Sequence, residues 1–246
     1  MRRQFNTDSL EHTSRSFLLH GEPGAGKTWL LGSAMAAYKP RSYILNFPGE
    51  DGLLTLQGLG LPGEDVETLE DWNAFLADIR IGKLKDTMAV GLDGLPQFYQ
   101  SVIIPSLVKT EFAEPSDYGR IHSRFESQIK AIKRAVPLLF CTARSDRSMD
   151  QVRQEAFITP DLPGRMAVGV AGIMDYVFYI EADAVAGRVR RRLYTVAPAN
   201  RRVITRYRTP RPLQPVYEDP TWTTLSRALQ EAGVSIPAAA NPQSTA

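Results

Sequence analysis

Cysteine, histidine and long apolar runs are scarce in this chain, and each scarcity excludes a class of protein. The single cysteine, Cys141, permits no internal disulfide and agrees with a reducing cytosol. The three histidines are scattered without cysteine partners, so we expect no zinc site. No apolar run approaches the ~20 residues of a membrane span, and no apolar core follows the arginines of "MRRQ" as it would in a signal peptide. We therefore expect a cytoplasmic protein without a membrane partner.

Net charge is also small. The formal charge is +2, with 43% hydrophobic and 23% charged residues, which is ordinary for a globular protein. The length of 246 residues predicts one large domain, residues 1–233, with its core at about 15–210. Residues 234–246, "VSIPAAANPQSTA", are expected to be a disordered tail.

The stretch "GEPGAGKT", residues 21–28, matches the phosphate-binding P-loop pattern G-x-x-x-x-G-K-[ST]. Its glycines let backbone N–H groups turn toward phosphate oxygens, and the following helix directs its positive end at the same anion. We expect Lys27 to pair with the β- and γ-phosphates of ATP and the Thr28 hydroxyl to coordinate Mg²⁺. The expected nucleotide contacts are Gly21, Glu22, Pro23, Gly24, Ala25, Gly26, Lys27, Thr28 and Trp29.

A second metal partner is expected at the end of a neighbouring strand. Residues 88–92 are apolar and lead directly to Asp93, which we expect to hold Mg²⁺ through a water molecule. The alternative is an aspartate that only opens the Asp93-Gly94 turn.

The residue that activates water is expected in the turn after the predicted strand 42–47. Gly94 stands where ATPases of the AAA+ type carry a glutamate, so the base must come from elsewhere. Glu50 is our expected base, placed to orient the attacking water near the γ-phosphate, with Asp51 as the second choice. The alternative is a solvated turn carboxylate or a helix N-cap.

The predicted strand 137–142 ends in Thr142, a polar residue that we expect to face the γ-phosphate and sense its loss. Arg144 could reach a phosphate or a DNA strand. The alternative is that both residues only cap a strand end.

Predicted strands and helices alternate along the chain. Strands are predicted at 16–20, 42–47, 87–92 and 137–142, and helices at 27–38, 70–81, 97–109 and 119–135. This order predicts an α/β fold, a mostly parallel sheet with helices on both faces and the ligand at the carboxyl ends of the strands. Residues 145–171 predict a mobile loop. After a strand at 174–183, residues 188–197 and 202–208 predict an antiparallel hairpin joined through "PAN".

Acidic residues are absent from 188–211, whereas arginines are dense there. A nucleic-acid surface, an arginine finger that enters a neighbouring subunit, and a strand edge protected by charge all remain open. The expected nucleic-acid contacts are Arg190, Arg191, Arg192, Arg201, Arg202 and Arg206.

The motif order "GEPGAGKT", "YILNFPGED", "VGLDGL", "DYGRI", "LLFCTARSD", "DLPGRM", "MDYVFYIE" and "RRRLYTV…RYR" resembles the phage-type RecA-like P-loop ATPases, also labelled phage nucleotide-binding or AAA-domain proteins. Some of these are single-strand annealing recombinases. The resemblance spans about residues 15–210. It implies the roles given above for Lys27, Thr28, Asp93 and Glu50. It also implies that Arg165, and Arg206 or Arg208, lie near a subunit interface and act in catalysis there.

Together these features predict a RecA-like α/β domain that hydrolyses ATP slowly with Mg²⁺ and acts on single-stranded DNA in recombination, annealing or replication. A homo-oligomer is expected, with a replication or recombination protein as a further partner and, if the protein is phage-encoded, the bacterial host cytoplasm as its location. Two alternatives remain open. One is a helicase loader or nucleotide-controlled switch without strong turnover, and the other is a small-molecule P-loop kinase with 145–171 as its lid.

Overall fold

The computed structural model describes residues 14–49, 52–81, 83, 86–108, 117–150, 155–185, 187–199 and 201–239. The strands are β1 (Arg15–Gly21), β2 (Ser42–Asn46), β3 (Gly63–Asp65), β4 (Ala89–Asp93), β5 (Leu138–Asp150), β6 (Glu155–Pro160), β7 (Tyr176–Val185), β8 (Arg188–Tyr194), β9 (Arg202–Val203) and β10 (Val216–Glu218). The helices are α1 (Lys27–Ala37), α2 (Leu69–Arg80), α3 (Leu95–Gln97), α4 (Ile104–Leu107), α5 (Tyr118–Ala135), α6 (Met166–Ile173) and α7 (Trp222–Glu231). A 3-10 helix, η2 (Gly52–Leu56), and a π-helix, η3 (Phe98–Ile103), complete the helical elements.

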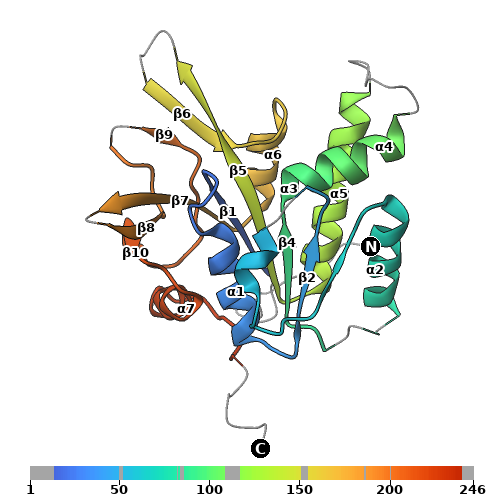
Figure 1. Ribbon diagram of the computed structural model, residues 1–246, viewed down its shortest axis with the longest axis horizontal. Helices are drawn as coiled ribbons and strands as arrows, with labels where there is room; N and C mark the ends of the chain where they lie inside the picture. Colours follow the sequence, from blue (N-terminus) through green and yellow to red (C-terminus); the bar gives the residue numbers. More distant parts are fainter. Residues whose placement is uncertain are drawn as a thin grey trace, which may run out of the picture.

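The sheet confirms the expected α/β class. Its strand order is β10-β8-β7-β1-β5-β4-β2-β3, and the strands from β3 to β7 along this order are parallel. The strand before the P-loop, β1, lies between β5 and β7 (Figure 1). Strands β8 and β10 add antiparallel partners at one edge. The carboxyl ends of β1 and β4 and residues 141–144 of β5 therefore meet at one edge of the main sheet, where a ligand of such a fold belongs.

Alternation along the strands divides the core between the two faces of the sheet. On one face, α1 and α7 cover β1 residues such as Phe17 and Leu19. On the other face, α2, α5 and α6 cover Leu18 and Val90. Side chains on successive strand residues point to opposite faces, which is why both faces of these parallel strands are apolar. No helix in the described part of the chain is long and apolar enough to cross a bilayer.

The segment 145–171 is not the loop that its polar sequence predicts. β5 is 13 residues long, and its second half, from Ser145, pairs antiparallel with β6; α6 follows. This strand pair extends beyond the main sheet, as Figure 1 shows, and most of its described side chains are exposed or only partly buried. A strand with little apolar burial carries no apolar alternation, and this is why the sequence pattern missed it.

Three other expectations need correction. β8 pairs with β7, and β9 pairs with β6, so no hairpin forms through "PAN". The helix expected at 97–109 is divided into α3, η3 and α4, and prolines occupy the first turns of α3 and α4. The packed chain also continues past residue 233, because Val234 and Ile236 are buried and the Tyr38 hydroxyl donates to the Pro237 carbonyl at 2.9 Å. Residues 240–246 lie outside the described part.

Candidate functional site

The P-loop joins β1 to α1 in the backbone conformation that its glycines permit. Gly24 and Gly26 have φ values of 77° and 97°, in the left-handed region that side chains disfavour. A Cβ on Gly21 would lie 2.1 Å from the Ile180 carbonyl oxygen of β7, so close strand packing also requires glycine there. The Lys27 ammonium donates to the carbonyl oxygens of Gly21 and Glu22 at 3.0 and 2.9 Å. The lysine is therefore folded over the loop that it would share with phosphate.

Thr28, Asp93 and Thr142 form one hydrogen-bonded cluster beside the P-loop. The Thr28 hydroxyl lies 3.1 Å from each carboxylate oxygen of Asp93. The Thr142 hydroxyl donates to Asp93 Oδ1 at 2.6 Å and accepts from the Gly94 N–H at 2.9 Å. The predicted metal pair is thus brought together, and Thr142 orients Asp93 directly. Its predicted role as a sensor of the γ-phosphate stays a prediction.

Asp93 is 1% exposed, and burial raises the pKa of its carboxyl. Hydrogen bonds from Thr142 and Thr28 and the charge of Lys27 act in the opposite direction. A cation that approaches such a carboxylate stabilises its charged form, because burial has removed the water that would otherwise solvate the charge.

The oxygen ligands of this cluster suit Mg²⁺. A Cβ on Gly52 would lie 2.8 Å from Thr28 Oγ1 and 2.9 Å from Asp93 Oδ2, so the chain after β2 also borders the cluster. Among the described residues, no group of three or more His, Cys, Asp and Glu could hold a metal alone. Mg²⁺ commonly takes one or two protein ligands and completes its shell with water and phosphate, which agrees with this donor set. The predicted base, Glu50, and its alternative, Asp51, lie outside the described residues.

His20, at the end of β1, is a buried titratable group beside this site. Its Nε2–H donates to the Ile204 carbonyl at 2.7 Å, and its Nδ1 lies 2.9 Å from the Ser145 hydroxyl. Burial is the main cause that lowers the pKa of His20 to about 4, with Lys27 adding to the shift and the Ile204 hydrogen bond opposing it. The neutral ring therefore ties β1 to β5 and to the segment after β9.

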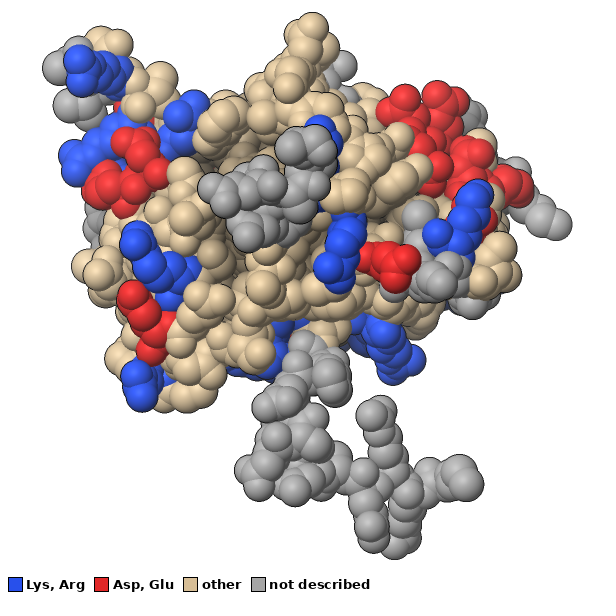
Figure 2. Space-filling view, turned by 90° about the horizontal axis from the view of Figure 1, so that it is seen from below, with Lys and Arg blue, Asp and Glu red and all other residues tan. Residues whose placement is uncertain are grey.

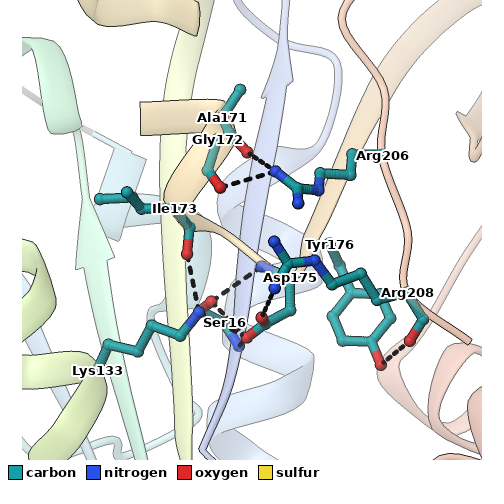
Figure 3. A network of polar contacts seen from close by, with 9 residues as sticks. All are labelled: Ser16, Lys133, Ala171, Gly172, Ile173, Asp175, Tyr176, Arg206 and Arg208. Carbon is teal, nitrogen blue, oxygen red and sulfur yellow. Dashed lines mark hydrogen bonds and ion pairs between the residues drawn. The ribbon is translucent and has the colours of Figure 1, made fainter. Parts of the chain in front are cut away.

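Arg206 and Arg208 lie at the opposite end of the sheet from the P-loop of the same chain. Arg206 donates to the Gly172 carbonyl at 2.7 Å, at the end of α6 (Figure 3). Arg208 lies 3.3 Å from Asp175, just before β7 begins. Both arginines thus stabilise described parts of the fold, and a catalytic role for either requires a neighbouring subunit.

Arg165 is exposed at the N-cap of α6. Arg144 pairs in register with Gly21 across β5 and β1.

Asp175 is the centre of the network in Figure 3. Its carboxylate accepts from the Ser16 N–H and hydroxyl at 3.0 and 2.8 Å and lies 2.9 Å from the Lys133 ammonium. A cavity of about 1110 Å³ at this end of the sheet is lined in part by Lys130, Lys133, Arg134 and Arg208. It lies beside residues that precede β1, β4 and β5, away from the phosphate-binding loop.

The expected arginine surface contains ion pairs that its own sequence span could not show. Arg190 pairs with Glu218 of β10, and Arg192 with Glu181 and Asp183 of β7. Arg201 lies 2.9 Å from Glu181, and the Arg202 guanidinium lies over the Phe157 ring. In Figure 2, basic and acidic side chains interleave at the left of the view instead of forming an unbroken basic patch.

Arg191 differs from its neighbours. Its side chain lies against Gly26 of the P-loop, a contact that sequence reasoning missed when it placed Arg191 on a nucleic-acid surface. The sequence signal that could have indicated this is the alternation of side chains along a strand, which places Arg191 on the opposite face of β8 from Arg190 and Arg192.

Sequence comparison identifies one family model that matches most of the chain. A family model described as an AAA domain matches residues 13–208. Among solved structures, the chain is similar to the flagellar accessory protein FlaH from Methanocaldococcus jannaschii, with a TM-score of 0.42 and 11% sequence identity. That similarity covers 74% of this chain and 77% of the FlaH chain. No curated protein matches the sequence.

Proposed function

The chain belongs to the AAA domain family, with its P-loop ATPase-like fold, and from that premise we propose that it binds ATP with Mg²⁺ and hydrolyses it. The observation that carries the proposal is the cluster of Thr28, Asp93 and Thr142 beside a P-loop lysine. A chance glycine-rich turn would not be accompanied by a buried carboxylate that the loop's own threonine contacts. The family match and the cluster thus support the same activity.

Each residue of the cluster has a distinct proposed task. The backbone of residues 21–28 binds phosphate oxygens, and Lys27 leaves its two carbonyl partners to neutralise the β- and γ-phosphates. Thr28 and Asp93 would hold Mg²⁺, which supplies positive charge to the phosphates when bound. Thr142 fixes the Asp93 carboxylate through the hydrogen bond at 2.6 Å.

Steady-state ATPase measurements test this proposal. We expect turnover that requires Mg²⁺ and falls at least about 100-fold in Lys27→Ala, because the ammonium group that neutralises the negative charge of the transferred phosphoryl group is lost. Lys130→Ala is the matched control, because Lys130 lies on α5, away from the P-loop, and its ammonium forms an i,i+4 pair with Glu126. Equal turnover in Lys27→Ala and Lys130→Ala, or in EDTA and Mg²⁺, would contradict the proposal. Binding of ATP without measurable turnover would favour the nucleotide-controlled switch.

We propose Glu50 as the water-activating base. Support comes from Gly52, two residues further along the chain, which lies against Thr28 and Asp93. Glu50→Gln is expected to lower kcat by about 100-fold while ATP still binds. Asp51→Asn is the matched variant. If only Asp51→Asn loses turnover, the base is Asp51.

Homo-oligomerisation and single-stranded DNA also remain proposals. Arg188 and Arg190 are exposed on β8, which supports a polyanion partner, although Glu218 offsets one of these charges. We expect single-stranded oligonucleotides to stimulate turnover, and the stimulation to fall as salt rises. If DNA does not change the turnover and does not bind at low salt, the proposal of a single-stranded DNA partner is contradicted. A phage recombination or replication role rests on the same result.

A catalytic arginine supplied by a neighbour, Arg165 or Arg208, predicts that kcat rises with protein concentration as subunits associate. A constant kcat across the association range would contradict it. In the kinase alternative, the lid would consist of the second half of β5, β6 and α6 instead of a loop.

A further inference from the structure

Arg191 lies on the face of β8 that faces α1, the helix after the P-loop. Its neighbour two residues on, Leu193, is buried in the same core cluster as Leu30 and Leu31 of α1. Because side chains alternate along a strand, Arg191 shares that face, whereas Arg190 and Arg192 lie on the other. A Cβ on Gly26 would be 2.6 Å from both Cδ and Nε of Arg191. The arginine stem therefore covers the last glycine before Lys27.

Local acceptors do not explain this placement. Arg191 Nε is buried, and nothing in the described chain accepts its hydrogen. Arg192 Nε is also buried without an acceptor, but the remainder of its guanidinium group, like the guanidinium group of Arg190, lies beside a carboxylate of an adjacent strand. No such carboxylate pairs with the Arg191 side chain among the described residues. A buried guanidinium nitrogen without an acceptor costs free energy unless a ligand supplies the acceptor.

The backbone of Arg191 is held firmly. Its N–H donates to the Asp219 carboxylate at 2.9 Å, and the Asp219 N–H donates back to its carbonyl at 2.7 Å. Asp219 has a φ of 39°, a left-handed conformation that non-glycine residues seldom adopt. Three residues later α7 begins, and the N–H of its first residue, Trp222, donates to Ser33 of α1 at 3.0 Å. Arg191 is thus fixed relative to the P-loop helix.

We propose that Arg191 binds the phosphate oxygens of the nucleotide within its own subunit, and is not part of a nucleic-acid surface. This inference rests on the proposed function, because it needs a nucleotide at the P-loop. Backbone amides and Lys27 supply donors from the loop, and Arg191 adds a planar, permanently charged donor group from β8. The fixed backbone of Arg191 and the packing of its stem beside Gly26 hold this group next to the phosphate-binding loop.

Calorimetric titration of Arg191→Met with ATP, ADP and adenosine tests the proposal. Methionine keeps an apolar stem over Gly26 and removes the charge. We expect ATP and ADP to bind about 10- to 100-fold more weakly, as for loss of a charged hydrogen bond, and adenosine binding to be unchanged. Arg191→Lys should recover part of the loss. Lys130→Met, on α5 and away from the P-loop, is the control and should bind like the wild type.

The outcomes separate this inference from the proposed function. No ATP binding by the wild type would remove both. Wild-type binding that Lys27→Ala abolishes and Arg191→Met leaves intact would overturn only the role of Arg191. Equal losses for ATP and adenosine would overturn the phosphate contact in favour of a contact to the base. Thermal melting without nucleotide checks that Arg191→Met folds. If it does not, Arg191→Gln replaces it, because glutamine also removes the positive charge. An unchanged ATP affinity relative to adenosine in that variant would contradict the phosphate contact.

Discussion

Each end of the sheet contains an aspartate with little solvent exposure, and the two aspartates differ in the charge of their partners. At the amino end, Asp175 lies beside two cationic side chains, Lys133 and Arg208, and accepts hydrogen bonds from Ser16. At the carboxyl end, the hydrogen bonds that the described side chains make to the Asp93 carboxylate come from the Thr28 and Thr142 hydroxyl groups, and Lys27 is turned to backbone carbonyls. Two cationic side chains compensate the charge of Asp175, whereas the hydrogen-bond partners of Asp93 are neutral hydroxyl groups. This difference separates a structural carboxylate from a ligand-binding one.

The largest expected effect is on turnover at the carboxyl end. Asp93→Asn keeps an oxygen for Thr142 and removes the negative charge, so we expect Mg²⁺-dependent kcat to fall about 100- to 1000-fold. The free energy of unfolding should stay equal or rise, because a desolvated charge has been removed. Steady-state kinetics and urea unfolding of the same preparation measure the two effects. A clear loss of stability with turnover intact would reverse the assigned roles.

Asp175→Asn should give the opposite pattern. Loss of the shared partner leaves Lys133 and Arg208 facing each other, and we expect the free energy of unfolding to fall by about 2–3 kcal/mol. Mg²⁺-dependent turnover should persist at temperatures where the variant is folded. Urea unfolding with an ATPase assay at low temperature checks this. Stability equal to the wild type would show that the amino-end network contributes little.

His20 sharpens the comparison through pH. Its pKa of about 4 in the folded chain lies below its ordinary value of 6.5, so the unfolded chain takes up the proton first as pH falls. Stability from this residue is therefore complete above about pH 6.5 and declines toward pH 4, by about 2 kcal/mol between pH 7 and 5. Urea unfolding of the wild type and His20→Gln at both pH values isolates the contribution. Parallel pH dependence in the two proteins would be the contrary result.

The smallest expected effect concerns Thr142. Thr142→Val removes the hydroxyl that joins Asp93 to the Gly94 N–H and keeps the shape of the side chain. We expect kcat to fall about 10-fold, the cost of losing one hydrogen bond to a charged group. Thr142→Ser keeps the hydroxyl and should stay near wild-type activity. Similar kinetics for Val and Ser variants would exclude Asp93 orientation as the task of Thr142.

Local sequence patterns predicted the parts of the molecule whose physics is local. The P-loop spacing placed Lys27 and Thr28, and an apolar strand followed by a carboxylate placed Asp93 at the same edge of the sheet. The helix at 119–135 followed from apolar periodicity and differs from α5 by one residue at its start. In each case neighbouring residues in the sequence determine the structure.

Features that depend on residues distant in the sequence could not be predicted from local patterns. Strand pairing decided that β8 joins β7, and the acids that neutralise Arg190, Arg192 and Arg201 come from β7 and β10. The arginine span therefore looked more positive in sequence than it is in the fold. The contact of Arg191 with Gly26 required the register of a strand that lies more than a hundred residues away in the chain.

The C-terminal helix α7 has a practical consequence for anyone who would shorten this protein. The family match ends at residue 208, yet Trp222 packs edge-on against Phe17 and Phe140, at ring-centroid distances of 5.4 and 4.9 Å. A polypeptide that stops at residue 208 would expose this aromatic cluster to water and would lack α7, which packs against α1. We expect such a fragment to aggregate, whereas one that ends at residue 239 retains every packing contact described for this face.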